Sequence, residues 1–443
     1  MICSGMTFRG NDLDFRSATE LAGLVRRREI SAYELVEHHL RRIEQVNPLI
    51  NAVVQLDADR ALDAAHGADD TVARGLPLGP LHGVPFTAKD NFETAGIITS
   101  IGVPERAAVV PTRDATAVVR LKAAGAILLG KTNLPPWGGG METDNEVFGR
   151  TNNPYNVERS VSGSSGGEAA IIAAGGSSAG LGTDSGGSVR DPAHFCGVAA
   201  LKPTAGLIPV TGVLDDEGPF GMMSDPRTQV GPMARSVADL ATLTSVLAGP
   251  DGIDAGCVPV PFKEPTGVSL QSLRIAVQFD NGIVTPTTDT IATLQAAAAA
   301  LVAIGVEIEE SDPPAGGHEL TQEVWDSYGG DLSSAALYRV LRRWDTYRSE
   351  MIAWLVDWDA ILCPVYPSAA HRHGEGIPDG ESYTTPYSLT GWPCVVVRCG
   401  TSADGLPIDV QVVAGPWRDD VALALAGALE ASLGGFQPPV MSL

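Results

Sequence analysis

Two clusters of glycine and serine near the middle of this 443-residue chain have the residue types and spacing to do chemistry. The first is SGSSGG at residues 162–167 and the second is TDSGGS at residues 183–188, with small and apolar residues between them. Clustered glycines let several backbone N–H groups converge on one anion or oxyanion, and the serines add hydroxyl groups at the same point. Because the clusters flank an apolar segment, we interpret them as parts of one site and not as a flexible linker.

Two shorter motifs match known sites by pattern, but their surroundings do not fit. Residues 125–132 (GAILLGKT) satisfy the pattern of a nucleotide-binding P-loop, which must lead into a helix. The four apolar residues favour a strand instead, and Pro135 and Pro136 oppose a following helix. Residues 163–167 (GSSGG) satisfy the nucleophile-elbow pattern G-x-S-x-G, which needs a buried strand directly before it. The preceding TNNPYNVERSV is polar and turn-forming, so we expect neither motif to act in its usual way.

The elements that must position the clusters can be predicted from helix caps and apolar runs. Residues 17–20 (SATE) and 31–34 (SAYE) both fit the capping box and predict helices, the second ending at the turn formed by residues 47–48. A third helix, capped by Asp114 and ended by Gly125, precedes a short buried strand, AILL.

In the second half of the chain, apolar strands alternate with helices. One helix ends at Gly305 and a strand at residues 306–308 follows it. Further helices are predicted at residues 236–247 and 419–433, and further strands at residues 273–279, 360–363, 394–398 and 408–413. This alternation predicts an α/β fold with a central mixed β-sheet covered by helices on both faces.

Composition limits the classes to which the protein can belong. The chain carries 53 acidic and 30 basic side chains, a formal net charge of -23. We therefore expect neither nucleic acid nor an anionic membrane surface as a partner. The hydrophobic content of 44% is ample for a large core, and the length allows about three domains or one large α/β unit.

The sequence also predicts a cytoplasmic protein. The first twenty residues contain Arg9, Asp12 and Asp14 and lack the apolar core of a secretory signal. No apolar stretch reaches the roughly 18 residues of a membrane span. The six cysteines, which form no C-x-x-C pair and are expected to be reduced, are at positions 3, 196, 257, 363, 394 and 399. His38 and His39 are helical neighbours that face different directions, so we expect no metal site there.

The stretch from Ser160 to Thr204 closely resembles the signature sequence of the amidase signature family. The similarity extends from ELVEHHLRRIEQVNPLINAVV through LHGVPFTAKDNF, GAILLGKTNLPPW and FGRTNNPYN to GWPCVVVRCG and GLPIDVQVVAGPWRDD. The resemblance implies the amidase signature fold as a single domain over residues 1–443. Within it, we expect N-terminal helices at about 17–46, a signature core at about 80–250 and a C-terminal part at about 270–435.

The resemblance further implies a catalytic unit of two serines and one lysine, with no metal or other cofactor. Ser188, which ends TDSGGS, matches the nucleophile, and Lys89, in TAKDN, matches the base. Ser164 matches the second serine, which follows a cis peptide bond from Gly163. A lysine is a base only when neutral, and burial lowers its pKa toward that condition. Ser164 would then pass protons between Lys89 and Ser188 and on to the leaving amine.

The resemblance also implies where the oxyanion of the tetrahedral intermediate is held. Its expected donors are the backbone N–H groups of Asp184, Ser185, Gly186 and Gly187. Water then hydrolyses the acyl-enzyme to a carboxylic acid plus ammonia or an amine. We expect Asp184 to hold this loop through backbone N–H bonds, Ser165 to be a supporting partner and Arg190 to form a scaffold ion pair.

Several positions near the clusters bear on the substrate. Ser162 replaces a glycine that is usual in the family, which is a small change. Asp191 stands where the family often has an apolar residue. It is either a pocket residue that favours a substrate with an amine or hydroxyl donor, or a buried structural acid, and His194 could pair with it. Met141 and Trp137 are further candidates for the substrate pocket.

We interpret the chain as an amidase that hydrolyses a small-molecule carboxamide or a related C–N bond. The alternative is the amidase (A) subunit of a glutamyl- or aspartyl-tRNA amidotransferase, which implies partner subunits and a supply of ammonia to aminoacylated tRNA. The short segment at about 313–347, the absence of a basic surface in the composition and the variant GSVRDPAHF weigh against it. The intact lysine and serines disfavour a non-catalytic binding protein on the same fold. The specific amide, the stereochemical preference and whether a homodimer forms stay open.

Overall fold

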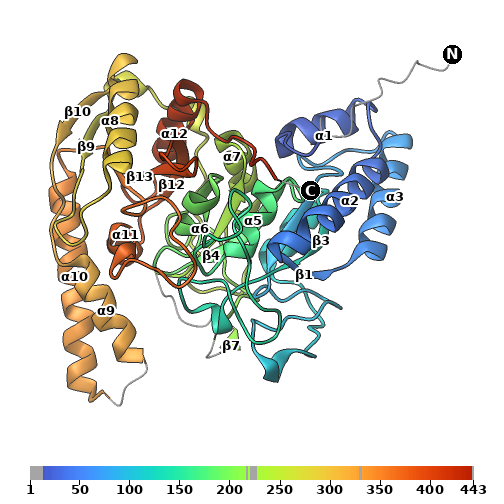
Figure 1. Cartoon of the computed structure of the whole chain (residues 1–443), viewed down its shortest axis with the longest axis horizontal. Coiled ribbons are helices and arrows are strands. Elements are labelled where there is room, and N and C mark those ends of the chain that lie inside the picture. The colour runs from blue at the N-terminus through green and yellow to red at the C-terminus, as the bar shows by residue number, and fades with distance from the viewer. Residues whose placement is uncertain (1–12, 216–217, 220–226, 329–331, 442–443) are drawn as a thin grey trace.

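One large β-sheet organises the computed structural model, which describes residues 13–215, 218–219, 227–328 and 332–441. Within these residues eleven strands form a mixed sheet in the order β1-β3-β2-β4-β8-β5-β12-β13-β11-β9-β10 (Figure 1). They are β1 (Val53–Leu56), β2 (Pro85–Lys89), β3 (Ile127–Thr132), β4 (Ala179–Asp184), β5 (Ala199–Lys202), β8 (Gln229–Ala234), β9 (Arg274–Val277), β10 (Glu307–Glu310), β11 (Ala360–Pro364), β12 (Cys394–Thr401) and β13 (Pro407–Ala414). A separate pair consists of β6 (Leu214–Asp215) and β7 (Gly218–Pro219).

Strand direction changes along the sheet. Parallel pairs join β3 to β2 and β2 to β4 on one side, and β11 to β9 and β9 to β10 on the other. The strands from β4 through β8, β5, β12 and β13 to β11 pair antiparallel, as does β1 with β3. The mixed sheet predicted from the sequence is therefore confirmed.

Helices cover both faces of this sheet. They are α1 (Ala18–Arg26), α2 (Ala32–Ile50), α3 (Ala58–Ala73), α4 (Thr116–Ala123), α5 (Gly166–Ala173), α6 (Arg190–Cys196), α7 (Val237–Leu247), α8 (Thr288–Ala303), α9 (Gly317–Tyr328), α10 (Ser334–Leu355), α11 (Thr385–Thr390) and α12 (Asp419–Leu433). Along β12, Val395 and Val397 join the apolar core under α7, α8 and α12, whereas Val396 joins the core under α2, α5 and α6. This alternation follows from the two-residue period of a strand.

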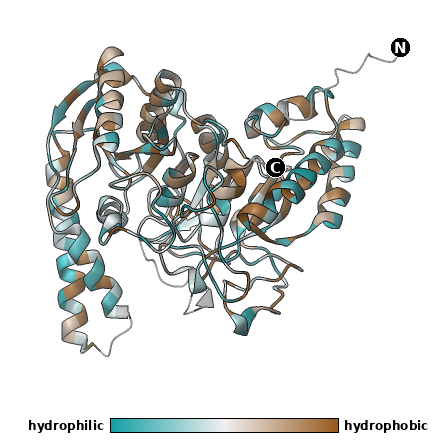
Figure 2. Cartoon of the chain, viewed as in Figure 1, coloured by the Kyte–Doolittle hydropathy of each residue, from teal (hydrophilic) through white to brown (hydrophobic). Residues whose placement is uncertain are grey.

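Elements from different parts of the chain occupy the two ends of the molecule. Figure 1 shows α1–α3 at one end, α8–α10 at the opposite end, and α5, α6 and β4 between them. Hydrophilic and hydrophobic bands alternate along α10 (Figure 2), whose buried residues are Val340, Trp344, Tyr347 and Met351. Their spacing places them on one helical face, which packs toward the sheet.

Two predicted helix ends are wrong. The structure continues α2 through Pro48 to Ile50, which is fully buried. A proline this close to the end of a helix costs little beyond one hydrogen bond. Asn47 compensates, because its side-chain oxygen accepts the N–H groups of Ala52 and Val53, each at 2.8 Å.

At α4 the predicted cap is wrong. Asp114 does not cap the helix, and its carboxylate accepts from the N–H of Ala95 and the ammonium of Lys122, both at 2.8 Å. The helix begins at Thr116, whose N–H donates to the carbonyl of Thr211 at 3.1 Å. A neighbouring loop thus takes over the role of the cap.

Most other predicted elements are confirmed to within a few residues. Both capping boxes form, at Ser17 and Ser31. The apparent P-loop lies in β3 and is followed only by a short 3-10 turn, Pro136–Gly138. Among the described residues no helix has the length and apolar character needed to cross a bilayer. The free cysteines there are Cys196, Cys257, Cys363, Cys394 and Cys399, and Cys3 lies outside the described residues, as do Arg9 and Asp12.

Candidate active site

The lysine and serines singled out from the sequence lie at one edge of the sheet. Lys89 is the last residue of β2, and the loop that carries Ser188 follows β4, its parallel neighbour. Parallel neighbours end at the same edge of a sheet, so this pair brings Lys89 next to the second glycine-serine cluster. Ser164 lies in the loop that leads into α5, and it contacts Lys89 directly.

Lys89 is fully buried and surrounded by hydroxyl groups. Its Nζ donates to Ser164 Oγ at 2.6 Å and to Thr183 Oγ1 at 2.8 Å. The Asn91 side-chain amide also donates to Thr183 Oγ1, at 3.1 Å. Burial lowers the pKa of Lys89 to about 7, against the opposing influence of the Asp184 and Glu168 carboxylates. The lysine is therefore poised to take up and release a proton near neutral pH. Sequence reasoning did not single out Thr183.

Ser165 joins the two clusters. Its N–H donates to the carbonyl of Ser188 at 3.0 Å, and its Oγ lies 3.3 Å from both the carbonyl and the N–H of Thr183. The preceding peptide bond, from Gly163 to Ser164, is cis. A Cβ at Gly163 would lie 2.4 Å from the carbonyl oxygen of Gly140, so only glycine lets the loop of Gly163 approach the loop of Gly140 so closely.

A buried ion pair holds the loop before Ser188. The Arg190 guanidinium donates to both carboxylate oxygens of Asp184, each at 2.9 Å, and both side chains are fully buried. Asp184 also accepts the N–H groups of Gly187 and Val189, at 2.9 and 3.1 Å. Although burial alone would raise it, the guanidinium keeps the pKa of Asp184 below its ordinary value. Both residues thus act as the scaffold that the sequence indicated.

Two N–H groups of this loop make no hydrogen bond to a described residue. The Gly187 N–H already donates to Asp184, so in this geometry it is turned into the loop. Within the described part of the chain no hydrogen bond occupies the N–H groups of Ser185 and Gly186. The Gly186 carbonyl accepts from Thr384 Oγ1 at 2.7 Å, which fixes the loop from the other side.

A buried carboxyl group lies behind the lysine. Glu168 of α5 is fully buried and accepts hydrogen bonds from the hydroxyl groups of Thr87 and, at 2.8 Å, Thr132. It occupies the space over Gly180, where a Cβ would lie 1.8 Å from Glu168 Oε1. Burial raises its pKa to about 8. Sequence reasoning missed this residue, although a glutamate in the otherwise apolar segment EAAIIAAGG is a visible signal.

Asp191 is fully buried beside the same loop. Its N–H donates to the Gly187 carbonyl at 2.7 Å, and neither carboxyl oxygen accepts a hydrogen bond of normal geometry from a described residue. Burial raises its pKa well above the ordinary value. The pairing with His194 that the sequence allowed does not form, because that imidazole bonds to the backbone of Asp409 and Ser368, both at 3.0 Å.

Trp137, Met141 and Trp325 lie on segments next to the two glycine-serine clusters. Trp137 is 40% exposed, and a Cβ on the neighbouring Gly138 would lie 3.9 Å from Ser164 Oγ. Met141, on the same loop, is partly buried. Trp325 of α9, which sequence reasoning missed, packs so closely on Gly186 that a Cβ there would lie 2.6 Å from its ring.

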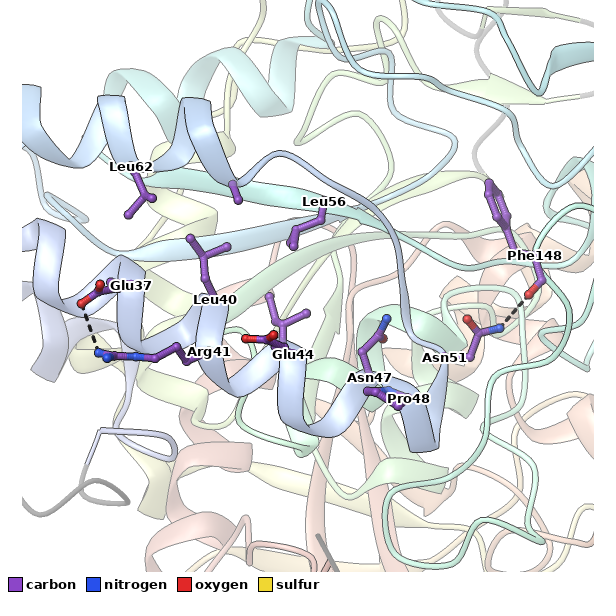
Figure 3. Close-up of a pocket in the computed structure, with 12 residues that line it drawn as sticks. Glu37, Leu40, Arg41, Glu44, Asn47, Pro48, Asn51, Leu56, Leu62 and Phe148 are labelled. Carbon is purple, nitrogen blue, oxygen red and sulfur yellow. Dashed lines mark hydrogen bonds and ion pairs between the residues drawn. The ribbon is translucent and has the colours of Figure 1, made fainter.

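A cavity of about 800 Å³ between α2 and α3 is not part of this site. Leu40, Leu56 and Leu62 point into it, and Glu37 pairs with Arg41 at its edge (Figure 3). Neither the lysine nor the serines line it. Across the described residues no group of three or more histidine, cysteine, aspartate or glutamate side chains is arranged to hold a metal ion.

Comparisons with known proteins agree over almost the whole length. The family model described as Amidase matches residues 34–328 and 326–423. The A subunit of glutamyl-tRNA(Gln) amidotransferase from Synechococcus sp. (strain CC9605) is 35% identical, over 87% of this chain and 90% of its own. An acylamidase of Rhodococcus erythropolis is 32% identical, over 95% and 96%. The solved structure of 6-aminohexanoate cyclic dimer hydrolase complexed with substrate is 30% identical, with a TM-score of 0.85 over 97% and 99%.

Proposed function

Because the chain belongs to the amidase signature family and is a hydrolase of amide C–N bonds, we propose that it cleaves a small-molecule carboxamide through an acyl-serine intermediate. The observation that carries the proposal is the 2.6 Å hydrogen bond between Lys89 Nζ and Ser164 Oγ in a fully buried setting. A lysine with a pKa near 7 has a substantial neutral fraction at neutral pH, as a general base requires.

In this proposal Ser188 is the nucleophile and Ser164 carries its proton. Neutral Lys89 takes the Ser164 hydroxyl proton while Ser164 takes that of Ser188, whose Oγ bonds to the amide carbonyl carbon. The N–H groups of Ser185 and Gly186 receive the oxyanion. The C–N bond then breaks as the proton returns through Ser164 to the leaving nitrogen. A water molecule hydrolyses the resulting ester to the carboxylic acid.

Labelling with a fluorophosphonate tests the nucleophile. The native enzyme should take up one equivalent of probe, and Ser188→Ala should take up none. Ser432→Ala is the matched control, since its hydroxyl is on the exposed end of α12 and, of the described residues, bonds to the Ala428 carbonyl alone. Undiminished labelling of Ser188→Ala would show that another residue is the nucleophile.

Replacement of the lysine tests the base. Lys89→Ala should lower kcat by about 10² to 10⁴ while leaving the far-ultraviolet spectrum unchanged, because general-base catalysis is removed and the fold is not. Turnover close to that of the native enzyme would refute the proton-transfer assignment. Addition and removal of zinc or a chelator should leave activity unchanged.

A second candidate function is the A subunit of a tRNA-dependent amidotransferase. It is favoured by the 35% identity to such a subunit from Synechococcus sp. (strain CC9605). The similar identity to an acylamidase and to 6-aminohexanoate cyclic dimer hydrolase supports the amidase instead. A panel of aliphatic, aromatic and amino-acid amides separates the two. Strict preference for glutamine together with copurification of further subunits would establish the amidotransferase role.

A further inference from the structure

A second cavity, of about 480 Å³, lies between the end of β9, the start of α9 and the segment that joins the 3-10 turn Gly380–Tyr383 to α11. These elements are neighbours at the α8–α10 end of the molecule (Figure 1). None of the lysine, serine and loop residues of the proposed catalytic unit lines it. The cavity therefore needs an explanation apart from amide hydrolysis.

Two largely buried residues line this cavity with side-chain polar groups that make no hydrogen bond to a described residue. Gln278 is 8% exposed and Tyr347 is 4% exposed. Their polar atoms are accessible from the cavity, where a ligand or bound water is able to hydrogen-bond to them. The carbonyl oxygen of Gln278 and the hydroxyl oxygen of Tyr347 are both able to accept a hydrogen bond.

The charged residues that line the cavity indicate the charge of the ligand. Asp280, Asp312 and Glu319 line it, and the lining residues, all of them described, include no lysine or arginine. His318 is turned to other partners, because its ring nitrogens lie 2.9 Å from Thr385 Oγ1 and 3.2 Å from Asp379 Oδ1. Asp280 is partly buried and Asp312 and Glu319 are exposed, and together the three carboxylates attract a cation and repel an anion.

The rings that line the cavity indicate an organic cation and not a metal ion. Tyr347, Tyr383 and Tyr387 contribute aromatic surface, and the volume matches that of a small-molecule site. An ammonium group donates up to three hydrogen bonds, which suits carboxylate, amide and hydroxyl acceptors, and aromatic faces attract cations. We propose that this cavity binds a small organic ammonium ion, at a site separate from that of amide hydrolysis.

One short segment separates the two sites. Tyr383 and Tyr387 face the cavity. Between them, Thr384 donates its hydroxyl to the Gly186 carbonyl at 2.7 Å, and its own carbonyl accepts from Arg190 at 2.8 Å. The same segment therefore lines the proposed ammonium site and supports the catalytic loop. The proposal of an ammonium site does not depend on the catalytic assignments.

Calorimetric titration of the full chain with benzylamine, protonated at pH 7, tests the proposal. Benzylamine should bind with 1:1 stoichiometry, whereas benzyl alcohol and benzoate, matched in ring and differing in charge, should bind at least about tenfold more weakly. Tyr347→Phe keeps the ring and removes the hydroxyl group, and Asp280→Asn keeps the shape and removes the charge. Each should weaken benzylamine about tenfold. Asp345→Asn, on the exposed face of α10, is the control and should bind as the native protein does.

Two results would overturn the proposal. Equal affinity for benzylamine and benzyl alcohol would show an apolar cavity with no preference for a cation. Binding that survives both cavity variants but disappears after fluorophosphonate labelling would place benzylamine in the catalytic site. Tyr347→Phe and Asp280→Asn are folded if their thermal unfolding temperatures are close to that of the native protein. Gln278→Met is a third variant for use if one of them does not fold.

Discussion

The partners of Lys89 determine what this residue is able to do. At hydrogen-bond distance it meets the hydroxyl groups of Ser164 and Thr183, whereas the Asp184 and Glu168 carboxylates act on it only from further away. Hydroxyl groups compensate an ammonium ion for lost hydration less well than a directly bonded carboxylate does. Burial therefore lowers the pKa of Lys89 to about 7, and a base is available without an adjacent histidine.

The first prediction concerns the pH dependence of activity. Because Lys89 must be neutral to accept a proton, and its pKa is about 7, kcat/KM should fall about tenfold per pH unit below 7 and level off above it. The measurement is kcat/KM from pH 5 to 9 with an amide whose own ionisation lies outside that range. An acid limb centred near pH 4, where carboxylates titrate, would contradict a lysine base.

The second prediction concerns Glu168. The ionised fraction of Glu168, whose own pKa is about 8, raises the pKa of Lys89, so Glu168→Gln should move the acid limb of kcat/KM to lower pH. The fold should tolerate glutamine, since the Thr87 and Thr132 hydroxyl groups are able to rotate between donating and accepting. Glu309→Gln, on the exposed edge strand β10, is the control and should leave the profile in place. Movement of the limb to higher pH would show that Glu168 does not favour the charged lysine.

At the scale of helices and strands, the sequence predicts what local patterns determine. Apolar runs predict β3, β11, β12 and β13, and the caps at Ser17 and Ser31 predict the starts of α1 and α2. These predictions succeed because caps and periodicity depend on residues close together in the sequence. The cap of α4 could not be predicted, since the carbonyl that replaces it belongs to Thr211, nearly a hundred residues on. Sequence order also says nothing of which strands are neighbours, so the contact of Lys89 with Thr183 needed the structure.

The third prediction concerns the strand under Glu168. In β4 a Cβ at Gly180 would overlap Glu168, so Gly180→Ala must displace the glutamate or the strand. We expect a loss of about 1–3 kcal/mol in the free energy of unfolding, together with lower activity, because Lys89 lies on the adjacent strand.

Gly67→Ala is the matched control for this substitution. Gly67 is in the middle of α3, and nothing lies within 4 Å of a Cβ placed there. Alanine should raise the free energy of unfolding by about 0.5–1 kcal/mol, since it lowers the entropy of the unfolded chain. Urea unfolding measures both variants. Equal effects of the two substitutions would show that the space over Gly180 is not filled as described.

At the scale of the whole molecule, Arg190 connects distant parts of the chain. It pairs with Asp184, and it also donates to the Thr384 carbonyl, to Ser388 Oγ and to Gln411 Oε1, at 2.7–2.9 Å. The buried guanidinium of Arg190 therefore connects the signature core to the C-terminal part through hydrogen bonds. The large sheet also contains strands of both parts. We expect residues 1–443 to behave as one domain, and the surface charge of -23 to have no part in holding the catalytic loop.

The last prediction tests this connection. Arg190→Met should lower the free energy of unfolding by about 3–5 kcal/mol, because it leaves the Asp184 carboxylate buried without its counterion. Arg190→Lys should cost less, since it keeps the charge but cannot supply the forked set of donors. Both should unfold at higher pH on acidification. The guanidinium holds the pKa of Asp184 below its ordinary value, so the ionised carboxylate stabilises the folded state at pH values above the ordinary pKa. This stabilisation is lost as the pH falls through the lowered pKa of the folded state.

The control for Arg190 is an exposed arginine that also pairs with a carboxylate. Arg343 pairs with Glu323 on the surface of α10 and α9, where an ion pair contributes about 0–1 kcal/mol, so Arg343→Met should change stability little. Urea unfolding followed by far-ultraviolet circular dichroism and by tryptophan fluorescence measures all three variants. If Arg190→Met costs no more than Arg343→Met, the buried pair does not join the two parts. If it costs several kcal/mol and the two signals still change together, the catalytic loop depends on the fold of the entire chain.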